Sequence, residues 1–516
     1  MGIPRFFKWI SESFPDTLSK ESDIAKLQKL LPNVDSLLID ANGIIHNCVK
    51  EVYFPEPRIR FAPASKTVVI ETPEQKKQKV FKNIVSYINK LFKIVKPKKV
   101  IFIAIDGTAP VAKQAQQRQR RYKSAENRNE AFDTNAITPG TGNYSFVFDT
   151  NAITPGTEFM SELVDYINKA IIKKWKCNIL FSPPTEPGEG EHKLMEYVRE
   201  KPMDTHVVYG LDADLFMLTL ATHCKNIYLL REDIFSSSNF ETFYHVVKVH
   251  EIAKKLYEQW GVNYSSQQNF INDFIFICFL VGNDFLHNIP SLWDLEASIN
   301  MMLEILKNTK IQIVNFSKKL GIELDNLSIF FSKIAAIEHK LLASQLNSKR
   351  YENETLNRSM VDIYDKTKGI DLNTFRENYY KKANVRDSDS NDYSKSYIQG
   401  LAWVNWYYHN KPKNWRWIFP YHYSPLITDL VEHLDIKPIH LDIQAPLTMN
   451  QQLLCVIPPK SKMLLPENLR RFYTDEKLKD FYPEKFEKDL SGKLKDWEAI
   501  ALLPFVDVEL ITKLVK

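Results

Sequence analysis

Cysteine is scarce in this sequence, and the few cysteines are scattered. Only five occur among 516 residues, and none stands at the spacing of zinc ligands or within a signature typical of a cysteine nucleophile. An odd, scattered set is typical of a reducing compartment rather than of a secreted protein held together by disulfides. The composition therefore predicts an intracellular location, cytoplasmic or nuclear with the cytoplasm favoured, and excludes a disulfide scaffold.

Long apolar runs and a strong charge imbalance are also absent. The longest apolar run, Phe274–Val281, has the length of a core segment rather than of a membrane span, and the N-terminal MGIPRFFKWI lacks the layout of a signal peptide. We therefore expect no membrane association. The formal net charge is only +5, so overall basicity indicates no partner, and what matters is where the basic residues gather.

The chain is too long for one ordinary hydrophobic core. We expect a first region over 1–345, a linker over 346–395 and a second region over 396–516. The linker is predicted from a polar, weakly periodic stretch that includes RDSDSNDYSKS. The second region is predicted from a dense run of tryptophan and tyrosine at 403–423, most of which we assign to core packing.

The first region alternates strand and helix patterns. Short apolar runs at Val34–Asp40, Val100–Ile105 and Thr205–Tyr209 read as buried strands, and Glu71–Val95 has the apolar spacing of a helix. This alternation predicts an α/β fold with a mostly parallel sheet and covering helices.

Acidic side chains follow these strands and helices at their ends. The carboxyl ends of parallel strands meet at one edge of a sheet, so the acids are expected to converge there. So many carboxylates in one place either raise their pKa values or bind cations, and oxygen ligands favour Mg²⁺ or Mn²⁺. The ordinary alternative is a solvated acidic loop, but the number of acids suits a phosphodiesterase site with two metal ions. The acids are Asp40, Asp106, Glu189, Glu191, Asp212, Asp214 and Asp284.

A basic stretch follows the strand that ends at Asp106. Between Pro110 and Glu130 it places Lys113, Gln117, Arg120 and Arg121 at i, i+4, i+7 and i+8, on one face of a predicted helix. A charge run is most often a solvated surface. Here the helical face of the four donors carries no apolar residue and lies behind the acids. Both features favour an anion-binding face.

The decapeptide FDTNAITPGT occurs twice, at 132–141 and at 148–157. The two copies lie too close together for a repeat architecture and indicate a local duplication. The second copy runs directly into EFMSELVDYINKAIIKKW, a predicted helix capped by Thr157. We therefore expect the second copy to belong to the fold and the first to form a surface loop without chemistry of its own.

A series of distinctive stretches follows in order along the chain: MGIPRFFKWI, IDANGIIH, IDGTAPVAKQAQQRQRRY, FDTNAITPGTEFM, PGEGEHK, GLDADLFML, VGNDFLHNIP, YIQGLAWVNWYYH, WRWIFPYHYSP, DFYPEKFEKDLSGK and WEAIALLPFVD. In this order they resemble the Xrn family of 5′→3′ exoribonucleases, and the resemblance extends from Met1 to about Asp507. The duplication, the compact spacer, the lack of long C-terminal extensions and the lack of a cysteine-rich knuckle depart from the pattern of other members.

The resemblance implies a nuclease core of the PIN/flap-nuclease type, braced by a second aromatic-rich α+β lobe. It implies a monomer that processively hydrolyses 5′-monophosphorylated single-stranded RNA to nucleoside 5′-monophosphates with two Mg²⁺ or Mn²⁺ ions, in RNA decay or processing. The seven acids fall on the family's metal site, and Lys113, Gln117, Arg120 and Arg121 fall on its 5′-phosphate pocket. His46 falls on a histidine that stacks on the first bases, and its partner is either Trp415 or Trp417.

Two other functions remain compatible with the same residues. A structure-specific 5′ flap or DNA nuclease would carry a similar set of acids, although a pocket for a terminal phosphate would block threading of a continuous strand. An inactive RNA-binding scaffold is a further possibility, against which the presence of all seven acids argues. Comparing the degradation of 5′-phosphorylated RNA with that of flap DNA distinguishes these functions.

Overall fold

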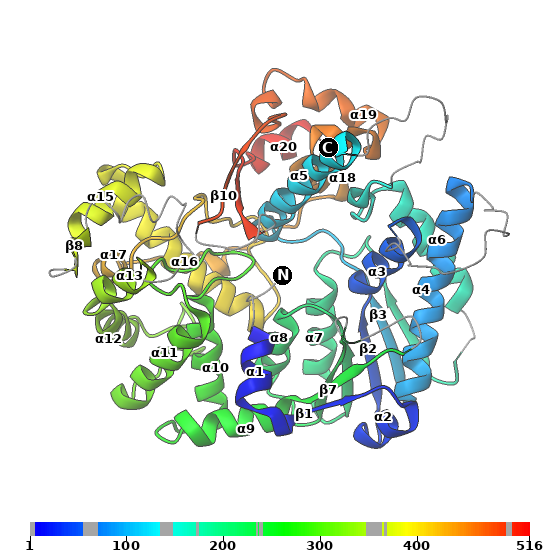
Figure 1. Ribbon diagram of the computed structural model, residues 1–516, viewed down its shortest axis with the longest axis horizontal. Helices are drawn as coiled ribbons and strands as arrows, with labels where there is room; N and C mark the ends of the chain where they lie inside the picture. Colours follow the sequence, from blue (N-terminus) through cyan, green and yellow to red (C-terminus); the bar gives the residue numbers. More distant parts are fainter. Residues whose placement is uncertain are drawn as a thin grey trace.

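The computed structural model describes residues 6–54, 71–134, 148–171, 175–233, 236, 241–346, 364–365, 369–491 and 498–515. Its centre is a seven-stranded sheet with the strand order β1-β7-β6-β5-β2-β3-β4 (Figure 1). Strands β4, β3, β2, β5 and β6 run parallel, and β7 and β1 continue the sheet in antiparallel pairing. The strands are β1 (Leu18–Glu21), β2 (Ser36–Asp40), β3 (Val100–Ala104), β4 (Asn178–Ser182), β5 (His206–Tyr209), β6 (Ile227–Glu232) and β7 (Tyr244–Lys248).

Helices cover both faces of this sheet. Alternation along β2 sends Leu37 and Ile39 into one hydrophobic cluster and Leu38 into another, so both faces of the central strands are buried. On one face lie α2 (Ile24–Leu30), α3 (Asn42–Tyr53), α4 (Pro73–Val95) and α6 (Glu158–Ile171). On the other lie α1 (Phe6–Ser13), α7 (Gly190–Glu200), α8 (Asp214–Ala221), α9 (Val249–Trp260) and α10 (Gln267–Phe279).

A helical region extends away from the sheet and shares the hydrophobic cluster that contains Leu38. Its longest helix contacts α8 and α10, and Trp403 and Tyr407 on it are buried in the same cluster as α8. The region consists of α11 (Leu295–Thr309), α12 (Leu324–Ala335), α13 (Glu338–Leu346), β8 (Tyr364–Asp365), β9 (Gly369–Ile370), α15 (Leu372–Lys382), α16 (Ser390–His409) and α17 (Ile427–Glu432).

The C-terminal part of the chain packs on α5 (Val111–Thr134), which rises from the sheet beside α18 (Figure 1). Arg118 donates through Nη1 to the carbonyl oxygen of Cys455 (2.9 Å), and Lys123 donates to that of Ala499 (2.7 Å). These contacts fix the side of α5 that faces away from the acids. The remaining elements are α18 (Met449–Val456), α19 (Glu467–Arg470), β10 (Glu487–Asp489), β11 (Ile500–Leu502) and α20 (Val508–Leu514).

The mostly parallel sheet with covering helices confirms the predicted fold class. The predicted strands at 34–40, 100–105 and 205–209 correspond to β2, β3 and β5. The division of the chain into domains stays a prediction. Within the range predicted as a linker the structure places α15 and the start of α16, and Phe375 and Tyr393 there are buried in the shared cluster. In the part of the chain that the structure describes, none of the helices has the length and apolarity to span a bilayer.

The second FDTNAITPGT copy is part of the fold, as predicted. Phe148 and Ile153 are buried in the hydrophobic cluster that contains Leu37 and Ile39. At the start of α6, Thr157 Oγ1 accepts a hydrogen bond from the backbone N–H of Met160 (3.5 Å). Most of the first copy, from residue 135 onward, lies outside the described residues. Our expectation of a surface loop there stays a prediction.

One copy of the duplicated segment is expected to suffice for folding. Deleting residues 142–157, or alternatively 131–144, leaves a single FDTNAITPGT that runs directly into EFM in either product. Because loop-closure entropy changes slowly with loop length, the free energy of unfolding should change by less than ~1 kcal/mol. Urea denaturation of both deletion variants beside the full chain measures this. Failure of both variants to fold would show that the duplication has a structural role.

Candidate active site

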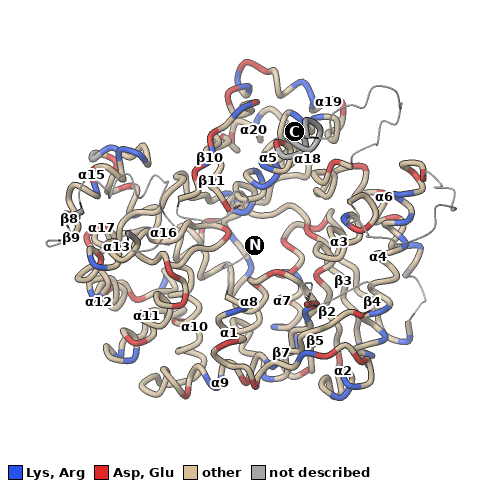
Figure 2. The backbone as a smooth tube through the Cα atoms, viewed as in Figure 1, with Lys and Arg blue, Asp and Glu red and all other residues tan. Residues whose placement is uncertain are grey.

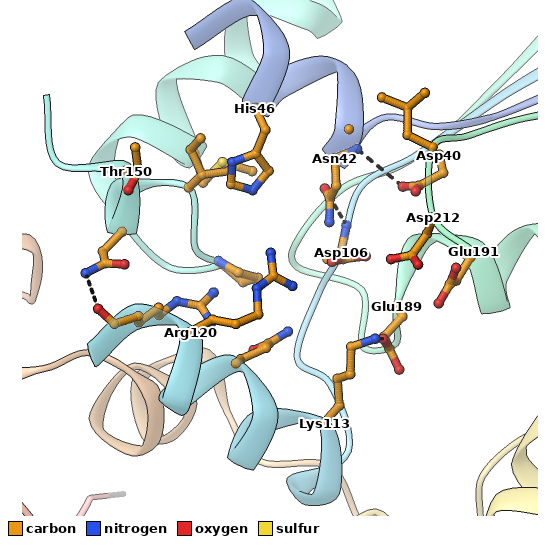
Figure 3. A pocket seen from close by; sticks show the side chains of 18 of the residues that line it. Asp40, Asn42, His46, Asp106, Lys113, Arg120, Thr150, Glu189, Glu191 and Asp212 are labelled. Atoms are coloured by element: carbon orange, nitrogen blue, oxygen red, sulfur yellow. Dashed lines mark hydrogen bonds and ion pairs between the residues drawn. The ribbon is translucent and has the colours of Figure 1, made fainter. Parts of the chain in front are cut away.

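The acids meet at the carboxyl edge of the sheet. Asp40 is the last residue of β2, Asp106 lies two residues beyond β3, and Asp212 lies in the turn between β5 and α8. These three strands are neighbours in the sheet, with β2 between β3 and β5. Parallel strands deliver their following residues to the same edge, and Figure 3 shows Asp40, Asp106 and Asp212 close together there.

The N-terminus of α7 brings Glu189 and Glu191 to the same place. Gly190, between them, donates its backbone N–H to Asp106 Oδ1 (2.6 Å). A Cβ atom at Gly190 would lie 3.1 Å from Asp40 Oδ1, so the absence of a side chain lets the helix approach the strand ends this closely. The two glutamates are thereby placed against the carboxylates of β2 and β3 (Figure 3).

Lys113, from the first turn of α5, is buried among the acids. Its Nζ lies 2.5 Å from Glu189 Oε2 and 2.7 Å from Asp284 Oδ2. The second oxygen of Glu189 accepts a hydrogen bond from the hydroxyl of Tyr407 on α16 (2.9 Å). Although burial opposes ionisation of Asp284, pairing with Lys113 holds the pKa of its carboxyl below the ordinary value.

Five of the seven acids, the basic face of α5 and His46 line one cavity of about 610 Å³ (Figure 3). Of the seven predicted acids, Asp214 and Asp284 are not among its lining residues. Asp214 is buried at the start of α8, and Asp284 lies behind Lys113. Figure 2 shows the basic residues along α5 near the acidic residues at the strand ends. The predicted residues that line the cavity are Asp40, His46, Asp106, Lys113, Gln117, Arg120, Arg121, Glu189, Glu191 and Asp212.

The acid cluster carries more negative charge than Lys113 neutralises. Burial, together with repulsion from Asp106 and Asp212, raises the pKa of Asp40 to about 8. Burial and repulsion from Asp212 raise that of Glu191 well above its ordinary value. Glu191 Oε2 and Asp214 Oδ1 are buried with no hydrogen-bond partner among the described residues. Buried carboxyl groups of this kind either hold a proton or bind a cation, and their oxygen donors fit Mg²⁺ or Mn²⁺.

The side chains are nevertheless not arranged as a finished metal site. Among the described residues, no group of three or more His, Cys, Asp or Glu side chains is placed to hold one metal ion. Part of the reason is that the ammonium of Lys113 occupies the space between Glu189 and Asp284. The predicted pair of metal ions therefore stays a prediction that the chemistry of the donors supports.

The basic side of the cavity is formed by Gln117, Arg120 and Arg121, one and two turns along α5 from Lys113. Arg121 Nε donates to Thr154 Oγ1 (2.9 Å). Burial and the neighbouring Arg120 cation lower the pKa of Arg121 to about 9. Among the described carboxylates, none forms an ion pair with Arg120 or Arg121, which leaves both guanidinium groups available to an anion.

The two predicted tryptophans differ in position. Trp417 is buried, and its ring stacks on Trp403 with 5.0 Å between centroids, so it belongs to the core. Trp415 is half-buried, its carbonyl accepts from the N–H of Val111 (2.8 Å), and its ring tip lies 3.8 Å from the Cβ position of Gly188. Neither tryptophan is among the residues that line the cavity around His46, and of the two the half-buried Trp415 remains the candidate for base stacking.

His46, on α3, borders the cavity and keeps contact with solvent. Desolvation of the ring beside the cavity walls, together with repulsion from the Arg120 and Arg121 cations, lowers the pKa of His46 to about 4. The imidazole is therefore neutral at physiological pH and presents a flat uncharged ring. A neutral ring beside two guanidinium groups is suited to stacking on a base.

Several residues of the site were missed by sequence reasoning. Thr150, Asn151, Ile153 and Pro155 of the second FDTNAITPGT copy line the cavity, although we expected this copy only to belong to the fold. The signal available was that FDTNAITPGTEFM is one of the stretches that resemble the Xrn family, although we assigned none of its residues to the site. Arg231 also lines the cavity and donates through Nη1 to the carbonyl oxygen of Asp212 (3.1 Å), and no motif in the sequence singles it out.

Comparisons with known proteins identify the family of the chain. The family model described as XRN 5′-3′ exonuclease N-terminus matches residues 1–233, and the model described as Xrn1 helical domain matches 265–373 and 343–516. The chain is 32% identical to 5′-3′ exoribonuclease 1 of Homo sapiens, over 98% of this chain and 33% of that protein. It is 30% identical to 5′-3′ exoribonuclease 1 of Saccharomyces cerevisiae, over 98% of this chain and 42% of that protein.

The chain thus spans between a third and a half of the length of these two relatives. Among solved structures, the catalytic core of Rad2 in complex with DNA substrate is 14% identical over 73% of this chain and 85% of that chain, with a TM-score of 0.33. A likeness this weak has no bearing on function. The two family models together cover nearly the whole chain in chain order, and the protein therefore belongs to the Xrn family of 5′→3′ exoribonucleases.

Proposed function

We propose that this chain is a 5′→3′ exoribonuclease that hydrolyses 5′-monophosphorylated single-stranded RNA, one nucleoside 5′-monophosphate at a time. The observation that carries the proposal is that a single cavity holds both an acid cluster and a cationic face. The cationic face suits a terminal phosphate, and the acid cluster suits a phosphodiester that is being cleaved. Two such subsites in one cavity place the scissile bond a short way from the 5′ end.

Divalent cations complete the proposed site. Asp40, Asp106, Glu189, Glu191 and Asp212 would hold Mg²⁺ or Mn²⁺, with Asp214 and Asp284 behind them. Such ions activate water and stabilise the leaving oxygen in phosphodiester hydrolysis. The chain's own contribution is to fix the carboxylates, through the Gly190–Asp106 and Tyr407–Glu189 hydrogen bonds, and to exclude bulk water by burial.

The basic face of α5 binds and orients the 5′ end in this proposal. Arg120 and Arg121 supply guanidinium donors, and Gln117 supplies an amide. A terminal monophosphate carries up to two charges and three acceptor oxygens, which these donors satisfy together. Lys113 stays part of the predicted phosphate-binding set. Its contacts with Glu189 and Asp284 support a second role for it beside the acid cluster.

RNA enters this cavity as a single strand, with its first bases stacked between His46 and Trp415. Aromatic stacking is tolerant of sequence, which an enzyme that digests any RNA requires. The protein acts as a monomer in this proposal. The proposal also includes an intracellular location, which the cysteine pattern predicts.

Replacing His46 with alanine is expected to slow degradation of all RNA sequences, and structured RNA most. Loss of one stacking contact, worth about 1–3 kcal/mol, weakens binding of the first base. Less binding free energy is then left to open a duplex. The measurement is the degradation rate of an unstructured RNA and of a hairpin with a short 5′ overhang. Equal rates for His46→Ala and the wild type on the hairpin would assign His46 to a structural role.

Circular RNA provides the test of an exonucleolytic activity. A linear RNA with a 5′-monophosphate is expected to yield nucleoside 5′-monophosphates in Mg²⁺, whereas the same sequence closed into a circle should stay intact. A 3′-end label on the linear RNA should be released last. Cleavage of the circle would identify an endonuclease, and degradation of neither RNA would identify an inactive scaffold.

A further inference from the structure

The second FDTNAITPGT copy forms a wall of the cavity, on the side away from the acids. Figure 3 shows Thr150 across the cavity from Asp212 and Glu191, with Arg120 beneath. Thr150, Asn151, Ile153 and Pro155 are among the lining residues. This wall lies at the cationic end of the cavity, where the proposed 5′ phosphate would bind.

Hydrogen bonds connect this wall to the basic face of α5. Thr154 Oγ1 accepts from Arg121 Nε (2.9 Å), and Asn151 Nδ2 donates to the carbonyl oxygen of Arg121 (3.3 Å). One turn further along, the hydroxyls of Ser124 and Thr150 lie 3.0 Å apart. Arg121 is therefore held by both its side chain and its backbone.

Hydrogen bonds also hold this segment in place, so it fixes the position of the α5 residues that it contacts. Thr154 is fully buried, and its hydroxyl donates to the carbonyl oxygen of Asn151 (2.7 Å). Asn151 also donates to Ser461 Oγ (3.0 Å), which links the wall to the C-terminal part of the chain. The hydroxyl of Thr154 thus has one hydrogen directed to Asn151 and a lone pair directed to Arg121.

The chemistry of this contact is specific. An arginine held by a carboxylate would be neutralised, whereas a threonine oxygen is an uncharged acceptor that fixes Nε and leaves the positive charge intact. With Nε occupied, the remaining guanidinium N–H groups are left for an anion in the cavity. Beyond them, Ile153 and Pro155 offer no side-chain donor for additional phosphate groups.

We propose that Thr154 is a positioning residue for recognition of the 5′-terminal phosphate: its hydroxyl holds the guanidinium of Arg121 in the orientation that binds one phosphate group. This inference rests on the proposed function, because it assumes that the cavity receives a 5′-monophosphate. It assigns a role to the second decapeptide copy that the identical first copy does not share.

The test compares the affinity of two RNAs that differ only at the 5′ end. Dissociation constants for 5′-monophosphate and 5′-hydroxyl RNA are measured in EDTA, where no hydrolysis occurs. Thr154→Val keeps the shape of the side chain and removes the hydroxyl. It should weaken binding of the monophosphate RNA about three- to tenfold and that of the hydroxyl RNA less than twofold, because only one hydrogen-bonded donor is misplaced.

Two further variants make the result specific. Thr154→Ser keeps the hydroxyl and should restore the wild-type ratio of the two dissociation constants. Thr138→Val makes the same change at the equivalent position of the first copy and should leave the ratio at its wild-type value. Thermal melting of the four proteins shows whether a loss follows the 5′ phosphate or the stability of the fold.

The outcomes separate the inference from the function beneath it. If the wild type binds both RNAs equally, the proposed function fails. If the wild type prefers the monophosphate and Thr154→Val keeps that preference, or weakens both RNAs alike, the role of Thr154 is refuted while the function stands. An effect of Thr138→Val as large as that of Thr154→Val would likewise refute the assignment to the second copy.

Discussion

Asp212→Ala is expected to abolish RNA hydrolysis while RNA binding remains. The carboxylate follows β5 at the edge where Asp40 and Asp106 end their strands, so its proposed role is to hold a cation rather than the substrate. Losing a ligand shared by the proposed ions removes several kcal/mol of stabilisation from the transition state, which corresponds to about a thousandfold or more in rate. The measurement is the rate at saturating Mg²⁺, beside the dissociation constant of the RNA.

Loss of folding is not expected to explain that result. Asp212 contributes to the repulsion that raises the pKa of Asp40, and the hydrogen bond from Arg231 uses the backbone of Asp212, which the substitution keeps. The substitution also removes the hydrogen bond that Asp212 Oδ1 accepts from the backbone N–H of Asp214 (3.5 Å), so the melting temperature should fall only slightly. A matched control is Asp204→Ala, which removes a carboxylate paired with the exposed Lys99 and should leave the rate unchanged. Substantial turnover by Asp212→Ala would contradict the assignment of the acid cluster.

Arg120→Ala and Arg121→Ala are each expected to remove most of the preference for a 5′-monophosphate. Charge-assisted hydrogen bonds contribute roughly 1.5–3 kcal/mol each, so one substitution should lower kcat/KM on monophosphate RNA about ten- to a hundredfold. The rate on 5′-hydroxyl RNA, which lacks the charge that these cations bind, should change little. The preference should thus flatten because the faster rate falls, not because the slower one rises.

Arg118 on the same helix supplies a contrast. Its guanidinium donates to the carbonyl oxygens of Cys455 and Phe481 and faces the C-terminal part of the chain, away from the cavity. Arg118→Ala should lower the melting temperature and reduce the rates on both RNAs by the same factor. If Arg120→Ala and Arg121→Ala behave like Arg118→Ala, the basic face of α5 has only a structural role.

Local sequence patterns predicted the sheet and its acids well, for a physical reason. A buried parallel strand is a short apolar run, and an acid directly after it, as with Asp40 and Asp106, must lie at the carboxyl edge. The helical spacing of α5 likewise placed Gln117, Arg120 and Arg121 on the cavity side. These are properties of neighbouring residues, which a single sequence displays.

Contacts between distant parts of the chain were not predictable in this way. Pairing of Lys113 with Glu189 and Asp284, and the hydrogen bond from Tyr407 to Glu189, depend on how α5 and α16 pack against the sheet. The burial of Trp417 against Trp403, which separates it from Trp415, depends on the same packing. No residue spacing encodes these tertiary contacts. Similarly, the polar composition around 346–395 suggested a linker although aromatic residues within it are buried.

The most direct measurement uses one RNA sequence with a 5′-hydroxyl, a 5′-monophosphate or a 5′-triphosphate, incubated with the wild-type protein in Mg²⁺ or in EDTA. The account predicts rapid degradation of the monophosphate RNA in Mg²⁺, slow degradation of the hydroxyl RNA, resistance of the triphosphate RNA and no hydrolysis in EDTA. Degradation of the triphosphate RNA as fast as the monophosphate RNA, or hydrolysis that persists in EDTA, would contradict a cavity that joins a phosphate face to a cation-binding acid cluster.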